Sequence, residues 1–154
     1  MSTVNKALVL RYITEVLNKG NTALTDELVA PSFLGHDPIG PDIRGPDGVK
    51  QHHATYRAAF PDLQLTVEEI VAEDDVVVWR WTAHGTHLGE ILGVAPTRKQ
   101  ATATGTVTCH VADGKLQETW SNWDALGLLR QLGALPIPNF HFPTRQTMAV
   151  LFVR

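Results

Sequence analysis

The stretch CHVADGKLQETWSNWDALGLLRQLG, Cys109 to Gly133, predicts how the second half of the chain folds. It has the pattern of a strand, a tight turn at ADG, a second strand and a helix that ends at Gly133. Asp124 stands where the second strand meets the helix, and His110 stands on the first strand. Asp124 is either an ordinary helix N-cap or a proton-transfer group, and these two roles do not exclude each other.

The length of the turn decides whether His110 and Asp124 share a face of the sheet. With a two-residue loop at 113–114, His110 would oppose Gln117, and Asp124 would lie on the other face. With a three-residue loop at 112–114, His110 and Asp124 fall on the same face. We favour the longer loop, because a type I turn closed by a left-handed glycine is a common hairpin connection. The choice matters, since a slip of one residue moves every side chain to the opposite face.

The face that carries His110 in this register is rich in polar side chains. Its members on the two strands are Thr102, Thr104, Thr106, Thr108, Trp120 and Asn122. Because a tryptophan is usually at least partly buried, we expect this face to line a semi-polar pocket rather than meet solvent. A carboxylate and an imidazole in one pocket suit acid–base chemistry near neutral pH, so Asp124 and His110 are the predicted catalytic pair.

The rest of the chain alternates between helical and strand-like patterns. Apolar spacing predicts helices near residues 3–19, 22–30 and 46–60, and strands near residues 31–38, 63–73, 76–87 and 100–112. Helices followed by an antiparallel sheet predict one α+β domain over residues 1–154. A strongly bent antiparallel sheet wrapped around the N-terminal helices would form a cone-shaped barrel with one internal pocket. Gly85 and Gly105, inside strand-like runs, would suit a bulge or bend.

Composition limits the partners and the compartment. Hydrophobic residues make up 44% of the chain and charged residues 19%, which is typical of a globular protein. The net charge is -3 without a basic run, so neither nucleic acid nor a membrane surface is an expected partner. The single cysteine, Cys109, fits a reducing compartment, and polar residues interrupt the N-terminal apolar pattern. These features predict a cytoplasmic protein.

Two histidine pairs invite a metal interpretation, which the spacing does not favour. His52 and His53 are adjacent, and His84 and His87 stand in HGTH, but no carboxylate or cysteine follows at a recognised ligand spacing. No phosphate-binding loop or dinucleotide fingerprint is present either. The sequence therefore predicts no metal and no cofactor.

A family resemblance rests on two segments. GTHLGEILGVAPTRK, followed by HVADGKLQETWSNWDALGLLRQLG, resembles the SnoaL-like polyketide cyclases, also called ester cyclases, of the nuclear transport factor two-like superfamily. The resemblance implies a cone-shaped α+β barrel, a homo-oligomer (a dimer or a tetramer) and a small hydrophobic or polyketide-like substrate. It also implies ring closure by intramolecular aldol condensation without a cofactor. Arg98 stands where many relatives have glycine.

The resemblance also implies a set of site residues. The acid–base aspartate of the family falls on Asp124, a pocket histidine falls on His110, and a polar pocket residue falls on His36. Asp124 would remove a proton from a carbon flanked by carbonyls, and its acid form or His110 would protonate the new alkoxide. Together with the residue patterns, this gives the predicted substrate-binding set of His36, His53, Trp81, His87, Trp120 and Asn122.

Two other functions stay open from the sequence. The chain could be a small-molecule binding protein without chemistry, or an isomerase or epoxide-opening hydrolase on the same fold. In the last case Arg80 and Asp124 would supply two members of a carboxylate–arginine–carboxylate group. Residues 134–154 extend beyond the resemblance, and their apolar, β-prone end predicts a segment that packs on its own domain or on a neighbouring subunit.

Overall fold

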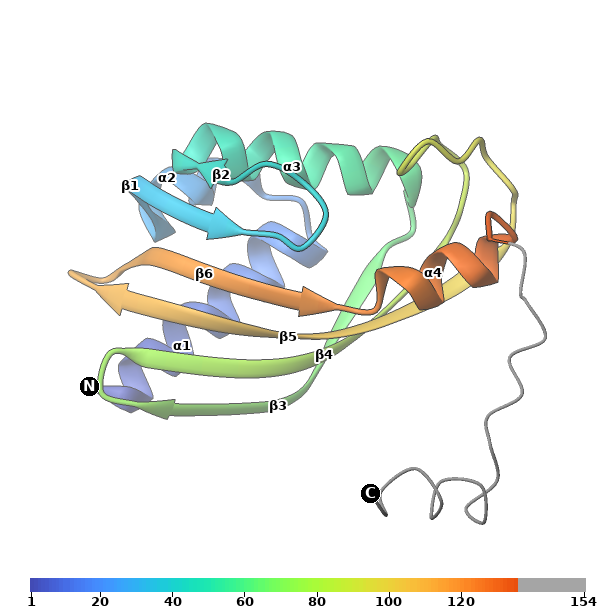
Figure 1. The fold of residues 1–154 in the computed structure, drawn as a ribbon. Coiled ribbons are helices and arrows are strands. Elements are labelled where there is room, and N and C mark those ends of the chain that lie inside the picture. Colours follow the sequence, from blue (N-terminus) through green and yellow to red (C-terminus); the bar gives the residue numbers. More distant parts are fainter. Residues whose placement is uncertain (136–154) are drawn as a thin grey trace, which may run out of the picture.

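The computed structural model describes residues 1–135 of the chain. The predicted packing of the C-terminal segment falls almost entirely on residues outside this range. The homo-oligomer likewise stays a prediction. Within the described residues, helices and one curved sheet form the α+β architecture that the sequence predicts (Figure 1).

The N-terminal half of the structure is mainly helical. It contains the helices α1 (Ser2–Arg11), η1 (Tyr12–Asn18), η2 (Thr22–Leu24), α2 (Thr25–Leu28) and α3 (Gly45–Ala59), with the strands β1 (Val29–His36) and β2 (Ile43–Arg44) between them. The C-terminal half contributes β3 (Gln64–Glu73), β4 (Val76–Thr86), β5 (Gln100–Ala112), β6 (Lys115–Trp123) and α4 (Ala125–Leu132). Gly133 ends α4 with a φ of 77°, as its predicted C-cap role requires.

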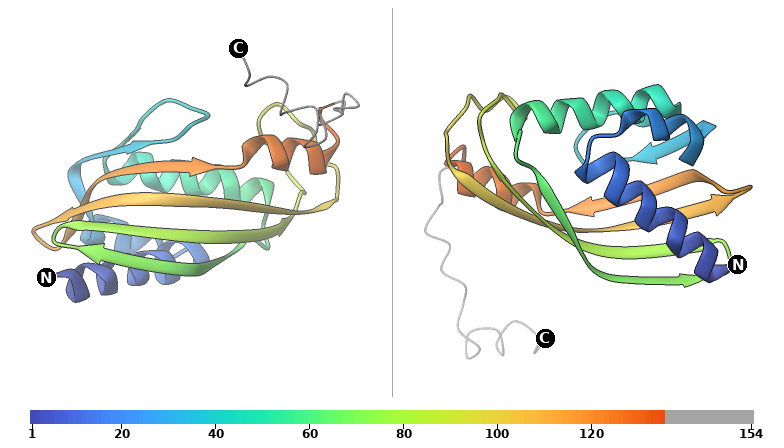
Figure 2. Two further views of the ribbon diagram at one scale, coloured as in Figure 1. Left: turned by 60° about the horizontal axis from the view of Figure 1, so that its bottom comes forward. Right: turned by 180° about the vertical axis from the view of Figure 1, so that it is seen from behind.

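The six strands form one sheet in the order β2-β1-β6-β5-β4-β3. All neighbouring strands run antiparallel except β1 and β6, which run parallel, so the sheet is mixed rather than purely antiparallel as predicted. The parallel pair arises because the chain crosses from β1 to β6 through α3 and the β3–β5 meander. Figure 2 shows α1 and α3 on the same side of the sheet, which curves round them.

The first helix is α-helical only in its first part. From Tyr12 to Asn18 it is a π-helix, in which, for example, the Lys19 amide donates to the Thr14 carbonyl. A π-helix is wider than an α-helix and places different residues on one side. Here it turns Tyr12, Val16 and Leu17 toward the space below α3.

The hairpin between β5 and β6 has a shorter turn than predicted. Ala112 pairs with Lys115, so the loop is the two residues Asp113 and Gly114, with φ values of 50° and 69°. Positive φ at both positions is the type I′ turn that Asp-Gly favours, because its twist matches that of the strands. A bulge at Gln117 then shifts the register, and His110 pairs with Glu118.

The bulge decides which side chains face inward. Val111 and Leu116 pair before it and Cys109 pairs with Thr119 beyond it, so the odd-numbered residues of β5 stay on the concave face. Val107, Cys109, Val111 and Leu116 are buried in the main core. The prediction that the threonine face lines the pocket is therefore wrong. The apolar face, which has more to gain from leaving water, lies against the helices instead.

Gly85 and Gly105 do not form bulges, because the β4–β5 pairing passes both without a shift. They make room for aromatic rings. A β-carbon on Gly85 would lie 3.0 Å from Cβ of Phe60. On Gly105 it would lie 2.6 Å from the Trp81 ring and 2.8 Å from the Asn122 carbonyl oxygen.

Gly105→Ala is therefore expected to lower the free energy of unfolding by about 1–3 kcal/mol, as overpacking in a filled core usually does. Chemical denaturation followed by tryptophan fluorescence would measure it. Gly40→Ala is the matched control, because no atom lies within 4 Å of the position that its β-carbon would take. Equal stability of the two variants would contradict the close packing of Trp81 on Gly105.

Candidate functional site

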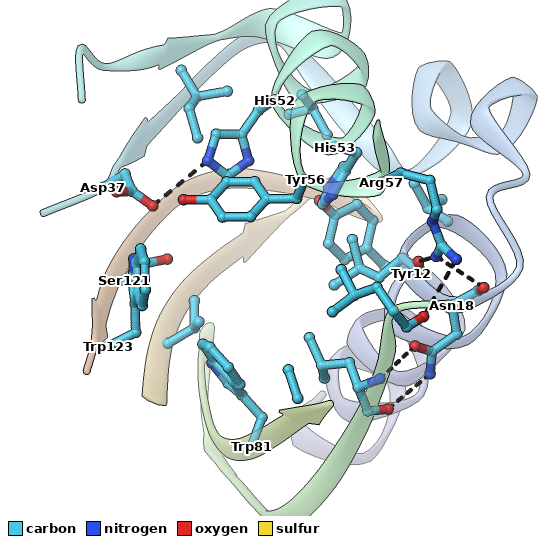
Figure 3. Close-up of a pocket in the computed structure, with 18 of the residues that line it drawn as sticks. Tyr12, Asn18, Asp37, His52, His53, Tyr56, Arg57, Trp81, Ser121 and Trp123 are labelled. Carbon is cyan, nitrogen blue, oxygen red and sulfur yellow. Dashed lines mark hydrogen bonds and ion pairs between the residues drawn. The ribbon is translucent and has the colours of Figure 1, made fainter. Parts of the chain in front are cut away.

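A cavity of about 300 Å³ lies between α3, η1 and the concave face of the sheet. Its walls are largely apolar and aromatic. Figure 3 labels ten of the residues that line it: Tyr12, Asn18, Asp37, His52, His53, Tyr56, Arg57, Trp81, Ser121 and Trp123. An apolar cavity with a few convergent polar groups is the usual form of a small-molecule site.

The side chains of Asp37 and His52 contact each other at one side of this cavity (Figure 3). Asp37 directly follows β1, and His52 lies in the middle of α3. His52 Nε2 lies 3.6 Å from Asp37 Oδ2, and the side chains are 30% and 10% exposed respectively. The carboxylate is therefore the more enclosed member, and the imidazole stays within reach of a molecule that enters the cavity.

The Asp37 carboxyl is held in its ionised form. Burial alone would raise its pKa, but hydrogen bonds from His52, the Ile39 amide and Trp123 outweigh that effect and lower the pKa below its ordinary value. The Ile39 amide donates to Asp37 Oδ1 over 2.9 Å. A fixed carboxylate of this kind orients an adjacent imidazole.

Tyr56 packs beside this pair, one turn along α3. Its ring centroid lies 4.9 Å from that of His52 and 6.2 Å from that of Trp123. Burial, and to a smaller extent the charge of Asp37, raise the pKa of Tyr56. The phenol is thus undissociated at neutral pH and lends a polar edge to the aromatic wall.

A second polar pair lies deeper in the cavity. Tyr12 Oη is 2.9 Å from Nε2 of His53, which also belongs to α3. Burial lowers the pKa of His53 to about 3, and the nearby His52 and Arg57 act in the same direction. Burial also raises the pKa of Tyr12. Both groups are therefore neutral at physiological pH, in contrast to the ionised Asp37.

Arg57 has a structural role in the wall of the cavity. Its guanidinium donates to the carbonyls of Leu17, of Asn18 at 3.0 Å and of Leu63 at 3.3 Å. Two of these carbonyls belong to the end of η1, where a positive charge complements the helix dipole. Arg57 thus ties η1 to α3 and closes the cavity at that end.

The structure places the predicted site residues in two different regions. His53 and Trp81 line the cavity. Asp124, His110, His36, His87, Trp120 and Asn122 are not among the residues that line it. For His110, Trp120 and Asn122 the cause is the face assignment, because the even-numbered side chains of β5 and of β6 beyond its bulge point to the outer side of the sheet.

Asp124 lies at the surface as the N-cap of α4. Its Oδ1 accepts a hydrogen bond from the Gly127 amide over 2.7 Å, and the residue is exposed. The predicted pairing of Asp124 with His110 inside a pocket is therefore wrong in its geometry.

Asp124→Ala is expected to lower the free energy of unfolding by about 1 kcal/mol, and Asp124→Asn by much less, because asparagine caps a helix nearly as well as aspartate. Thermal or urea unfolding of the two variants would measure this difference. A large loss of stability in the asparagine variant would mean that the negative charge, rather than the cap hydrogen bond, is what the helix needs.

On the outer side of the sheet, His36, His110 and Trp120 form an aromatic cluster. Trp120 stacks on His36 at 5.2 Å between ring centroids and meets His110 edge-on at 5.0 Å. His36 also contacts Glu118 at 2.8 Å and Asp42 at 3.2 Å. These contacts explain why Trp120 is half-buried without lining the cavity, and Asn122 beside it is exposed.

His87, Arg80 and Arg98 have local roles. His87 is fully buried, and its Nδ1 accepts a hydrogen bond from the Thr97 amide over 3.2 Å. The exposed Arg80 pairs with Glu69 at 3.0 Å. Arg98 has a φ of 60°, a left-handed conformation that favours glycine and so accounts physically for the glycine implied by the resemblance.

Within residues 1–135, no three histidine, cysteine or acidic side chains come together in a group that could hold a metal ion. Over the same residues, no helix is long and apolar enough to cross a membrane. Burial raises the pKa of the Cys109 thiol to about 12, so this cavity-lining cysteine is a packed thiol.

The sequence analysis assigns no catalytic or binding role to Asp37, His52, Tyr12 or Tyr56. A usable signal was present for Asp37, because a carboxylate directly after a strand and before a proline often stands at a sheet edge. His52 was considered only as a metal ligand. Tyr12 lies within the segment 3–19 whose apolar spacing predicts a helix, and only the π-helix and the position of α3 bring its hydroxyl to His53.

Comparison with known proteins gives a consistent result. Residues 7–132 match the family model of the SnoaL-like polyketide cyclases. Aklanonic acid methyl ester cyclase AcmA of Streptomyces galilaeus is 28% identical over 127 residues, covering 80% of this chain and 88% of that protein. Nogalonic acid methyl ester cyclase of Streptomyces nogalater is 27% identical over 124 residues, covering 79% and 92%. A structure from Jannaschia sp. CCS1, assigned to the SnoaL-like polyketide cyclases, superimposes with a TM-score of 0.81 at 26% identity and covers 88% of this chain and 95% of its own.

Proposed function

Because this chain belongs to the SnoaL-like polyketide cyclase family, we propose that it closes a ring in a polyketide-like ester by an intramolecular aldol reaction. The observation that carries the proposal is the Asp37–His52 pair in an otherwise apolar cavity. Relatives named as methyl ester cyclases support the substrate class. The proton-transfer group assigned here is this pair in place of Asp124 and His110.

The chemistry requires only movement of a proton within one molecule. His52, oriented by the Asp37 carboxylate, removes a proton from a carbon flanked by two carbonyls. The carbanion, delocalised into those carbonyls, attacks a third carbonyl of the same chain and forms the new carbon–carbon bond. The resulting alkoxide takes the proton back from His52, so that substrate and product have the same composition and no electrons are gained or lost.

The cavity favours a neutral ester over a free acid. Asp37 already places one negative charge in it, and Arg57 is engaged with main-chain carbonyls. Lys50, the other cationic side chain among the described residues that line the cavity, is engaged with Asp26 and Asp47. A substrate carboxylate would therefore meet repulsion from Asp37. The aromatic walls, including Trp81 and Trp123, suit flat conjugated rings. Alignment of two reacting carbons in this space can lower the barrier by several kcal/mol, roughly the scale of well-oriented intramolecular reactions.

The test is product analysis with purified protein and a synthetic methyl ester that carries a β-dicarbonyl and a ketone within ring-forming distance. We expect a cyclic product of unchanged mass, separated by chromatography and identified by NMR. The matched free acid should react much more slowly. Failure to cyclise such esters, together with tight binding of them, would favour the alternative of a binding protein without chemistry.

The epoxide-opening alternative finds less support. It would need an arginine between two carboxylates, and Arg80 lies exposed with Glu69 on the strand side away from the cavity. Including an epoxide substrate in the same product analysis would test it directly.

A further inference from the structure

We propose that Tyr12, positioned by His53, donates a hydrogen bond to the substrate carbonyl oxygen on which negative charge develops during proton removal. The inference rests on the proposed function, because it assigns a second role in the same cavity. It concerns the Tyr12–His53 pair, which the ring-closure steps above do not use.

The pair is built from two elements that meet only in the folded chain. Tyr12 opens the π-helix η1, and His53 lies on α3. Both line the cavity, and their polar atoms are 2.9 Å apart. The rings are tilted by 60° with centroids 6.0 Å apart, so the contact is a hydrogen bond between edges rather than a stack.

The Tyr12–His53 pair has one hydrogen-bond donor that the contact between the two side chains does not use. At neutral pH the phenol carries one hydrogen and the neutral imidazole carries one N–H, and the contact between them uses one of the two. Among the described residues, neither Tyr12 Oη nor a ring nitrogen of His53 has another hydrogen-bond partner. When His53 Nε2 donates to the phenol oxygen, the Tyr12 hydroxyl is free to donate into the cavity.

Burial is the main reason why the pKa of His53 is low, and the nearby His52 and Arg57 lower it further. The positive charge of Arg57 therefore partly offsets the repulsion that Asp37 exerts on an anion in this cavity. The neutral pair itself carries no charge that would repel an enolate. A preorganised donor in a water-poor site is the arrangement that stabilises a developing oxyanion most effectively.

The positions of His52 and His53 also suit two separate roles in the cavity, proton removal by His52 and hydrogen bonding by the Tyr12–His53 pair. His52 and His53 are neighbours, with ring centroids 5.8 Å apart and planes at 78°. Figure 3 shows His52 beside Asp37 on one side and His53 with Tyr12 on the other. A carbonyl compound held between them would meet the proton acceptor at its α-carbon and the hydroxyl donor at its oxygen.

The first test measures binding of 4-nitrophenol, whose ionised form mimics an enolate and absorbs at a different wavelength from the phenol. Because Asp37 repels an anion in this cavity, the binding is measured in the Asp37→Asn background, where we expect phenolate binding that Tyr12→Phe weakens at least tenfold. Binding of 4-nitroanisole, which has the same shape and no ionisable hydroxyl, should not change. Asp37→Asn provides a background in which repulsion by the carboxylate is removed.

Thr106→Val is the control, since it removes a hydroxyl from an exposed side chain on the outer side of the sheet, and it should retain the preference for phenolate. Equal phenolate binding with and without the Tyr12 hydroxyl in this background would overturn the proposal. With a confirmed ester substrate, Tyr12→Phe should lower kcat by roughly 10²–10³-fold with little change in KM, as loss of one oxyanion donor does. Phenolate binding that depends on Tyr12, without any ring closure, would support the donor site while rejecting the proposed function.

Discussion

Asp37→Asn is expected to lower the rate of ring closure by roughly two to four orders of magnitude, the usual contribution of a placed proton-transfer group. The substitution keeps the size of the side chain and removes the charge that holds His52. His52→Gln should cause a loss of similar size. Because the two residues act as one unit, the double variant should be little slower than either single variant.

Two controls make this result specific. Asp42→Asn changes an aspartate of the same connecting loop that contacts His36 rather than the cavity, and it should keep the wild-type rate. Asp124→Asn should do the same, because Asp124 caps α4 at the surface. Rates would be measured as kcat and as kcat/KM, with ligand binding checked separately. A large loss in Asp124→Asn, with Asp37→Asn near wild type, would return the catalytic role to Asp124.

Acidification is expected to destabilise the protein through His53. Its pKa is 6.5 in the unfolded chain and about 3 in the folded protein, because burial and the neighbouring His52 and Arg57 disfavour its charged form. Between these two values the unfolded chain binds a proton that the folded protein does not bind. The free energy of unfolding should therefore fall as the pH falls, by up to about 1.4 kcal/mol per pH unit from this group.

The measurement is urea unfolding at a series of pH values between 7 and about 4. In His53→Gln, which keeps a hydrogen-bonding group for Tyr12, the slope should be smaller by up to that amount. His36 acts in the opposite direction, because hydrogen bonding to Glu118, and to a lesser extent Asp42, raises its pKa. His36 is present in both wild type and His53→Gln, so its contribution to the pH dependence cancels when the two slopes are compared. His110→Gln is the matched control on the outer face, and an unchanged slope in His53→Gln would contradict the neutral state of His53.

Much of the fold was predictable from local patterns. The apolar spacing of the helices, the alternation of the strands and the caps at Asp124 and Gly133 are properties of short segments. The parallel pairing of β1 with β6 was not predictable in this way, because it depends on where α3 carries the chain. The π-helix was equally hidden, since its residues have the same apolar stripe as an α-helix.

The site was predicted less well, because the threonine face of β5 was expected to line the pocket and the apolar face lines it instead. Gln117 forms a bulge that no alternation pattern reveals. Without the bulge, the two-residue turn at 113–114 would place His110 and Trp120 on opposite faces, so the turn and the faces could not both be deduced from the sequence. The sequence places His110 and Trp120 on one face correctly, but the face is the outer one. Asp37 and His52 were harder still, because their contact joins a loop after β1 to the middle of α3.

The bulge at Gln117 has a consequence for how related chains differ in length. Two residues, Gln117 and Glu118, occupy the space opposite His110, where a regular strand would need one. A chain that lacked one residue at this point would keep Leu116 and Thr119 facing the interior. Loss of one residue is therefore expected to be tolerated here. Elsewhere in the same strand, it would exchange interior and exterior side chains.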